Sequence, residues 1–359
     1  MKPGQRSRQR IQYLTASDGV RLAWADVGEG PLLVKAPTWL SHLEYDWDNP
    51  LWSHWTRFFA EHFRFVRSDE RGCGMSDWNP GDLSLDRWVD DLSAVVDAAC
   101  PSGPVRLLGI SQGAAICIAY AARYPDRVSH LVLHGAYARG SWKRGALRTE
   151  QQYRAMVDLT RIGWGKPNPT FRQLFTSRFI PGGSDEQLRW FNDLCLKTTT
   201  GDIAARLFEV RATLDVTDLL PAVKARTLVL HARDDEVTSL DEGRLVAAGI
   251  PGAEFVELDS RNHIILAHEP AWARFEQAVL DFLQVRGTAR DDPAFAALSA
   301  RERQILALIV NGLSNADIAE QLGISDKTVR NHTSNLFDKL GVWTRAQAMV
   351  FARDRGFSA

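Results

Sequence analysis

Short apolar runs alternate with amphipathic stretches from residue 11 to residue 260. Most of these runs are nearly all apolar, which predicts strands buried on both faces, as in a parallel sheet. Between the runs, residues 85–99 and 114–123 have helical character, and the closing stretch 271–285 carries apolar residues at helical spacing. We therefore predict one doubly wound α/β domain over residues 11–285. Its predicted strands include residues 32–36, 64–68, 105–110, 128–134, 227–232 and 254–258.

Three segments depart from this alternation. Residues 138–222 are helical in pattern and rich in aromatic side chains, which predicts a lid inserted into the domain. Residues 286–297 mix glycine, proline, small and charged residues, which predicts a linker. The first ten residues contain Lys2, Arg6, Arg8 and Arg10 but no acid. We interpret residues 1–10 as a solvated basic tail, with contact to nucleic acid as the alternative.

Residues 298–359 have the pattern of four short helices. Ser299 and Glu302 are spaced as a capping box, and Gly312 follows the apolar positions of the first helix. The second helix is predicted to begin at Asn315 and to stop at Gly323. The fourth helix is predicted over residues 345–353, with an apolar side formed by Ala346, Met349 and Val350.

The third of these helices, capped by Ser325, has a polar and mildly basic outer side. Val329, Leu336 and Leu340 are predicted to face inward. Such a helix fits the major groove, where arginine can bond guanine in a fork and asparagine can pair with adenine. The residues predicted to contact DNA are Lys327, Thr328, Arg330, Asn331, His332, Ser334 and Asn335, of which Lys327, Thr328 and His332 are better placed for phosphates.

The motifs LSxRExxIL, GLSNxxIA, LxIS and KTVRNHxSNLxxKLGV occur in order within residues 298–357. This region resembles the LuxR/FixJ family of bacterial regulators. The resemblance implies a helix-turn-helix domain, double-stranded DNA as partner and transcriptional control as output. A helical bundle used only for assembly is the alternative, and the number of family-typical positions argues against it. Trp343 departs from the family, which usually has a smaller residue there.

A GxSxG motif, Gly109 to Gly113, follows the predicted strand 105–110 and opens a predicted helix. In this context the motif needs small residues because the turn is strained and tightly packed, and it lifts Ser111 Oγ toward a substrate. The partners of such a serine follow as an acid and then a histidine, each in a loop after a strand. Asp235 and His263 meet this order, and Asp234 is the competing acid.

Residues 10–285, including the stretch DERGCGMSD at 69–77, resemble the α/β-hydrolase superfamily. The resemblance implies a triad in which His263 takes the proton of Ser111 and Asp235 orients the imidazole. Asp235 is preferred to Asp234 because the family's acid commonly lies two residues before valine or isoleucine. The resemblance also implies an oxyanion hole from the backbone N–H of Gln112 and a second donor, for which Trp39 is the candidate.

The loop before Trp39 departs from the family. The usual His-Gly is absent, and the sequence reads Lys35-Ala36-Pro37-Thr38. A shift of register by two residues would place Pro37 at the donor position, where it has no N–H to offer. The loss of one oxyanion donor costs roughly 10² to 10³ in rate. This departure therefore bears directly on whether the triad turns over a substrate.

Composition limits the remaining possibilities. No run of about 18 apolar residues and no secretory signal is present, so we expect a cytoplasmic protein without a membrane span. The four cysteines form no CxxC pair, and we expect neither a metal site nor a cofactor. Net charge is −1, and residues 298–359 hold eight basic and six acidic side chains. Modest DNA affinity per copy favours a homodimer on two half-sites.

These features predict a transcriptional regulator whose hydrolase-like domain senses a small molecule. The twelve tryptophans favour an apolar or aromatic effector, such as an ester or lactone. The alternative is an active serine hydrolase that turns over its own effector. A third interpretation, a large domain used only for dimerisation, leaves the order of the triad residues unexplained.

Overall fold

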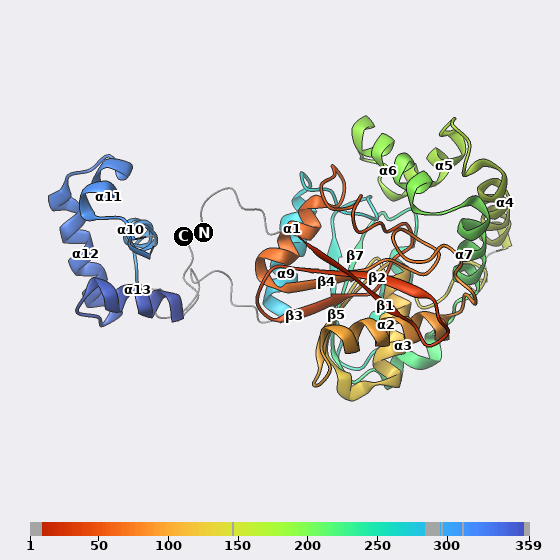
Figure 1. The fold of residues 1–359 in the computed structure, drawn as a ribbon, viewed down its shortest axis with the longest axis horizontal. Coiled ribbons are helices and arrows are strands. Elements are labelled where there is room, and N and C mark those ends of the chain that lie inside the picture. Colours follow the sequence, from red (N-terminus) through yellow and green to blue (C-terminus); the bar gives the residue numbers. More distant parts are fainter. Residues whose placement is uncertain (1–8, 146, 284–294, 296, 311, 355–359) are drawn as a thin grey trace. The chain divides into compact units, whose positions relative to one another are not determined.

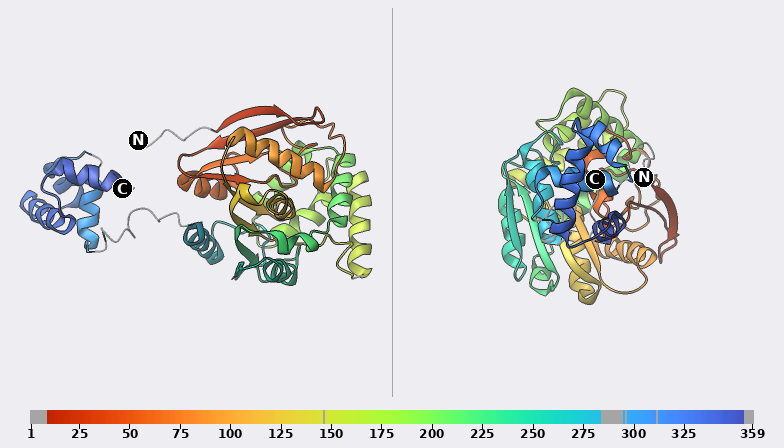
Figure 2. Two further views of the ribbon diagram at one scale, coloured as in Figure 1. Left: turned by 90° about the horizontal axis from the view of Figure 1, so that it is seen from below. Right: turned by 90° about the vertical axis from the view of Figure 1, so that its left-hand side faces the viewer.

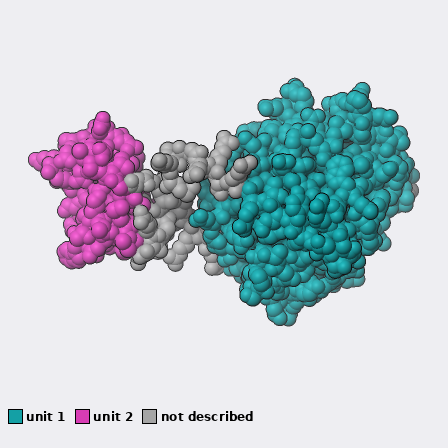
Figure 3. All heavy atoms as spheres, in the orientation of Figure 1, with its two compact units in different colours: residues 1–279 teal, residues 280–359 magenta. Residues whose placement is uncertain are grey.

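The computed structural model describes residues 9–145, 147–283, 295, 297–310 and 312–354. The chain divides into two compact units, residues 1–279 and 280–359 (Figure 3). The predicted basic tail lies outside the described residues except for positions 9 and 10. The predicted linker 286–297 also lies outside them, except for positions 295 and 297.

In the described part of the first unit, eight strands form one sheet in the order β1-β2-β4-β3-β5-β6-β7-β8. The pairs β1–β2 and β2–β4 are antiparallel, and the neighbours from β4 through β3 to β8 are parallel. This arrangement confirms the predicted doubly wound α/β sheet and adds an antiparallel edge. The strands are β1 (Arg10–Thr15), β2 (Arg21–Val27), β3 (Leu32–Lys35), β4 (Arg64–Ser68), β5 (Val105–Ile110), β6 (Val128–His134), β7 (Arg226–Ala232) and β8 (Glu254–Leu258).

Helices cover both faces of the sheet (Figures 1 and 2). On one face, α1 (Ser53–His62) packs against α9 (Pro270–Leu283), with the rings of Trp55 and Phe275 4.6 Å apart. On the other, α2 (Leu85–Ala99), α3 (Gln112–Arg123), the 3₁₀ segment η2 (Thr217–Ala222) and α8 (Leu240–Gly249) share one buried apolar cluster. The central strands β5, β6 and β7 are mostly buried between these layers, which explains their nearly continuous apolar sequence.

Four helices lie between β6 and β7, within the region where the sequence predicts a lid: α4 (Leu147–Gly163), α5 (Thr170–Phe179), α6 (Asp185–Thr198) and α7 (Gly201–Thr213). Ser184 and Gln187 form a capping box at the start of α6, and Thr200 caps α7. Figure 1 shows these helices, in green, gathered at one end of the sheet. The insertion therefore supplies walls for a cavity near the carboxyl ends of the strands.

The second unit is helical and contains α10 (Ala300–Val310), α11 (Asn315–Leu322), α12 (Asp326–Leu340) and α13 (Arg345–Asp354). The capping box is formed: the Ser299 N–H donates to Glu302 Oε2 at 2.7 Å, and the Glu302 N–H donates to Ser299 Oγ at 3.3 Å. Gly323 and Gly341 end α11 and α12 with φ of 63° and 66°, a conformation that favours glycine. Local sequence signals thus set these helix ends.

The core of this unit differs from the sequence prediction at α13. Ala348 and Ala352 are the buried positions, whereas Val350 is 57% exposed and Ala346 is also exposed. The predicted apolar side was wrong except for Met349, which packs partly against the core. The small alanines allow α13 to approach α10 closely. Phe295 is also buried in this core, so the packed region begins before residue 298.

Candidate functional site

Ser111 lies at the sharp turn between β5 and α3 with φ 53° and ψ −122°, a conformation that L-residues rarely adopt. Its N–H donates to the carbonyl of His134 at the end of β6, at 2.8 Å. A Cβ on Gly109 would lie 2.7 Å from Ala114 Cα, and one on Gly113 would lie 3.2 Å from the Pro37 carbonyl oxygen. The two glycines of the motif are therefore required by close backbone packing, which holds the strained serine at the cavity.

The acid and the histidine of the predicted triad are in contact. His263 Nδ1 lies 2.6 Å from Asp235 Oδ2, and both residues are buried. Asp235 Oδ1 accepts the N–H groups of Val237 and Thr238 at 2.8 and 3.0 Å. Burial by itself would raise the pKa of Asp235, but His263 and these hydrogen bonds lower it. Asp234, the competing acid, is exposed to solvent.

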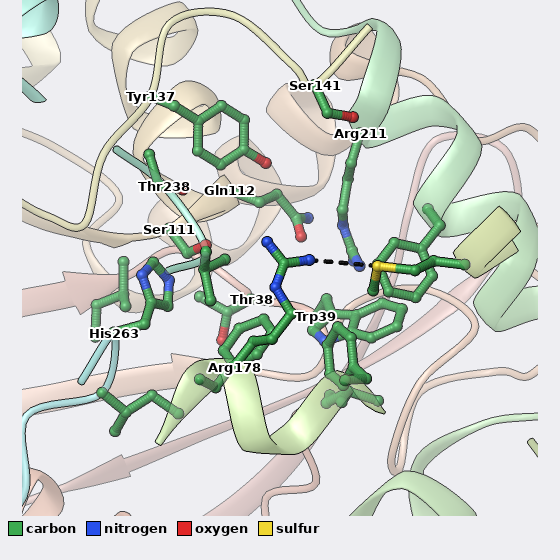
Figure 4. Close-up of a pocket in the computed structure, with 18 of the residues that line it drawn as sticks. Thr38, Trp39, Ser111, Gln112, Tyr137, Ser141, Arg178, Arg211, Thr238 and His263 are labelled. Atoms are coloured by element: carbon green, nitrogen blue, oxygen red, sulfur yellow. Dashed lines mark hydrogen bonds between the residues drawn. The ribbon is translucent and has the colours of Figure 1, made fainter. Parts of the chain in front are cut away.

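Several contacts fix the backbone and the ring of His263. The His263 N–H donates to the Phe179 carbonyl at 2.9 Å, and His134 Nε2 lies 2.9 Å from the His263 carbonyl oxygen. Gly135, with φ 57°, lies directly against the ring, and a Cβ there would be 2.7 Å from His263 Cε1. His263 Nε2 is buried and has no hydrogen-bond partner among the described residues. Both His263 and Ser111 line the same cavity (Figure 4).

The two predicted oxyanion donors also line this cavity. Gln112 is the first residue of α3, where backbone N–H groups lack partners within the helix. Trp39 packs its ring against Phe208 and Phe175, with centroids 4.0 and 4.7 Å away, and so forms part of the cavity wall. In place of the usual histidine, Lys35 donates to Thr38 Oγ1 at 3.2 Å and so ties this loop to the end of β3.

The cavity is mostly apolar and has a volume of about 80 Å³. Aromatic side chains from the sheet loops and from the inserted helices surround it. Its lining also includes Arg144, Arg178 and Arg211, which no sequence motif marks as site residues. They belong to the insertion, which carries no motif. The available signal was the presence of arginines within an otherwise aromatic and apolar segment.

In the second unit, α12 presents the predicted DNA-facing side chains at helical spacing. Lys327, Arg330, Asn331, Ser334 and Asn335 are exposed, while Thr328 and His332 are half-buried. Thr328 Oγ1 lies 2.7 Å from Ser325 Oγ in the N-terminal cap. Arg330 pairs with Asp326 at 2.8 Å on the exposed surface, a weak ion pair that a stronger acceptor can replace.

Among the described residues, no group of three or more His, Cys, Asp or Glu side chains is arranged to hold a metal ion. Nor does any helix in the described ranges have the length and apolar character needed to span a membrane. The cysteines at 73, 117 and 195 are buried free thiols.

Comparison with known proteins assigns both units. Residues 53–270 match the family described as serine aminopeptidase, S33, and residues 296–352 match the bacterial regulatory proteins of the luxR family. The chain belongs to the S33 α/β hydrolases and ends in a LuxR-type helix-turn-helix. The LuxR-type unit binds DNA, and the protein is a transcriptional regulator of this type with a hydrolase-like domain.

Relatives of the S33 domain and of the LuxR-type domain support this assignment. The AB hydrolase superfamily protein YisY of Bacillus subtilis is 26% identical over 70% of this chain and 91% of its own length. The probable transcriptional regulatory protein SgaR of Hyphomicrobium methylovorum is 29% identical over 60% of this chain and 77% of its own length. The DNA-binding transcriptional activator DevR/DosR of Mycobacterium tuberculosis is 39% identical over 20% of this chain, which covers a third of that protein.

Solved structures share the fold of the hydrolase domain. A hydrolase from Pseudomonas aeruginosa matches with a TM-score of 0.63 and 25% identity, covering 76% of this chain and 98% of that one. The enol-lactonase from Burkholderia xenovorans matches with a TM-score of 0.62 and 22% identity, covering 76% of this chain and all of that one. These matches confirm the predicted α/β-hydrolase fold.

Proposed function

We propose that the α/β-hydrolase domain binds a small-molecule effector in the cavity beside Ser111 and that occupancy alters DNA binding by the LuxR-type domain. The supporting observation is the cavity itself: an apolar, aromatic-walled space beside Ser111 and His263, in a chain whose other unit binds DNA. A ligand shifts an equilibrium only as far as its affinities for two states differ. Contacts with the walls provided by α5 and α7 would be a source of such a difference if the two states place these helices differently.

The effector class that fits the site is an ester or lactone with an apolar body. Trp39, Phe175, Phe179 and Phe208 offer rings to an apolar or aromatic group. Ser111 lies where a carbonyl carbon would meet its hydroxyl, with the first N–H groups of α3 beside it.

The regulator acts as a homodimer in this proposal, with one α12 on each half-site. Side chains on one exposed side of α13 and the turn before it support a second copy as the partner. Trp343 is 86% exposed and Val350 is 57% exposed, and Ala346 lies exposed between them in sequence. Large apolar side chains gathered on a small domain favour burial against another protein surface.

A second candidate function is hydrolysis of the effector, favoured by the 2.6 Å contact between Asp235 and His263 and by the unpartnered Nε2. In this reaction, Ser111 Oγ attacks the ester carbonyl and its proton passes to His263 Nε2. The N–H groups of Gln112 and Trp39 bond the oxyanion. His263 then returns the proton to the leaving alkoxide. Water activated by His263 releases the acid and restores Ser111.

Comparison of the wild type with Ser111→Ala separates the two candidates. The control variant is Ser102→Ala, an exposed serine in the loop between α2 and β5. Two quantities are measured: hydrolysis of 4-nitrophenyl butanoate, and binding to an operator selected from random DNA by the full chain, with and without aryl esters and acyl lactones.

The proposal predicts that an ester or lactone changes operator affinity in the wild type and in Ser102→Ala. If Ser111→Ala abolishes only hydrolysis, sensing is independent of turnover. If it abolishes both, sensing works through the acyl-enzyme. If none of the esters or lactones changes operator binding by the wild type, the proposed sensing is wrong.

A further inference from the structure

The cavity beside Ser111 carries positive charge that an uncharged ester leaves unused. Arg144, Arg178 and Arg211 line it, and none of its lining residues in the described part of the chain is Asp or Glu. The side chains of Arg178 and Arg211 enter from different helices, α5 and α7 (Figure 4). In a space this enclosed and apolar, charges are weakly screened and favour a ligand of opposite sign.

Arg211 has donors that the protein does not use. Its Nη2 donates to Glu70 Oε2 at 2.6 Å, but its buried Nε and Nη1 have no partner among the described residues. Gln112 donates its Nε2 to the same carboxylate at 3.0 Å, and its own Oε1 accepts neither of the free arginine donors. Buried donors left unpaired destabilise the fold, so their retention in a cavity points to a ligand that satisfies them.

A third free donor among the lining residues is the hydroxyl of Ser141. Ser141 is buried and its Oγ has no partner in the described structure. The loop that carries it is fixed to the end of α7, because Gly140 donates to the Leu214 carbonyl at 2.7 Å and Trp142 donates to the Ala212 carbonyl at 2.9 Å. Figure 4 shows Ser141 above Arg211, whose side chain extends from there toward Arg178 and Trp39. Ser141 is therefore a free donor separate from those of the guanidinium.

We infer that the ligand of this cavity carries a carboxylate, bound by Arg211, at one end of its apolar body. The planar carboxylate matches the fork of a guanidinium, whose donors lie in one plane. A negative charge also suits the local balance, because Glu70 offsets only Arg211 and the charges of Arg144 and Arg178 remain. This inference rests on the proposed function and narrows the effector class to apolar acids, including half-esters and lactone acids.

The aromatic walls define the rest of the ligand. The Trp39 ring contacts Phe175 and Phe208 and lies under the Arg211 guanidinium, whose carbon is 4.7 Å from the ring centroid. This cation–π contact holds the guanidinium against the wall of the cavity. An aryl or alkyl body beside Trp39 therefore places its carboxylate at Arg211 and its other end toward Ser111 and His263.

The test compares 4-phenylbutanoate with its uncharged amide, 4-phenylbutanamide, by calorimetric titration into the full-length protein. We expect the wild type to bind the acid at least about tenfold more tightly than the amide, as for a charge-assisted hydrogen bond. The double variant Glu70→Gln/Arg211→Met removes the ion pair as a unit, so no buried charge is left unpaired. In that variant the acid-to-amide preference is expected to disappear.

Two further variants keep the test independent of folding effects. Arg178→Met alters a half-buried side chain and is expected to reduce the preference in part. Arg206→Met removes an exposed arginine from the same helix as Arg211 and is expected to preserve the preference. Thermal unfolding of each variant identifies any that fail to fold.

The carboxylate inference is overturned if the wild type binds the amide as tightly as the acid, or if the folded double variant retains the preference. It is also overturned if the wild type binds neither compound. None of these results bears on the proposed function, which is judged by whether esters or lactones change operator binding. Conversely, tight binding of the acid without any change in operator affinity supports the carboxylate site and contradicts the proposed sensing.

Discussion

Asp235 Oδ2 lies 2.6 Å from His263 Nδ1, joining two loops that follow adjacent strands, β7 and β8. The other carboxylate oxygen is held by two backbone N–H groups. The carboxylate is therefore fixed from one side while it orients the imidazole from the other. A substitution that keeps the first oxygen can therefore test the role of Asp235 toward His263 without disturbing its loop.

Asp235→Asn is expected to reduce hydrolysis of 4-nitrophenyl butanoate by about 10⁴. Asparagine keeps an oxygen for the N–H groups of Val237 and Thr238, but it cannot stabilise a charged imidazole. Asp234→Asn, one residue away and exposed, is the matched control and should retain activity. Equal losses in both variants, measured as initial rates at fixed pH, would contradict this division of roles.

On α12, Arg330 and Lys327 are expected to contribute differently to DNA binding. Arg330→Ala should cost about 1–3 kcal/mol at one base position of the operator and relax specificity there. Lys327→Ala should weaken binding to all sequences and reduce the salt dependence by about one phosphate contact. Binding to operator variants at several salt concentrations measures both effects. Identical sequence profiles for the two variants would contradict the assignment of Arg330 to a base.

Asp46 is expected to make the stability of the hydrolase domain fall as pH rises. Burial raises the pKa of Asp46 from 3.8 to about 7, despite hydrogen bonding to the His42 N–H. Between these values the folded state holds a proton that the unfolded state releases, so the free energy of unfolding decreases with pH. Asp46→Asn should remove this slope.

Urea unfolding of the wild type and Asp46→Asn at about pH 5, 6.5 and 8, two values between the unfolded and folded pKa of Asp46 and one above both, measures the difference. The variant should gain stability relative to the wild type as pH rises. Asp48→Asn, at a position 62% exposed and paired with Arg57, controls for loss of charge on the same segment. A constant difference between wild type and Asp46→Asn at all three pH values would refute the prediction.

Val350→Glu is expected to weaken self-association, because it places a charge on the exposed side of α13, whose preceding turn carries the exposed Trp343. Operator affinity should fall about tenfold or more as binding to two half-sites is lost. Sedimentation of the full chain reports the oligomeric state without DNA. Gln321→Glu, which adds the same charge at an exposed position of α11, should sediment as the wild type does. Unchanged sedimentation of Val350→Glu would exclude this surface.

Local signals in the sequence were sufficient for most of the elements. The ranges of β5 and β6 follow directly from apolar runs, because strands covered on both faces need mostly apolar side chains. The turn at Ser111 and the stops at Gly323 and Gly341 depend on backbone conformations that few residues adopt. Such signals involve only neighbouring residues and can be recognised in one dimension.

Tertiary contacts decided what local signals left open. The family resemblance favoured Asp235 over Asp234 only by its spacing to Val237, and the approach of His263 from the next loop shows that Asp235 is the partner. Similarly, Ala346 and Ala348 are equally small, and contact with α10 determines which is buried.

Arg211 shows most clearly that a residue's role at the site depends on tertiary contacts. Its contact with Glu70 crosses 141 positions of sequence, and its free donors are defined only by the cavity around them. The sequence by itself determined which residues can form strands, turns and caps, since these depend on each residue's own backbone and its near neighbours. The identity of the site's charged groups was decided by folding, because burial and pairing depend on residues that are distant in the chain.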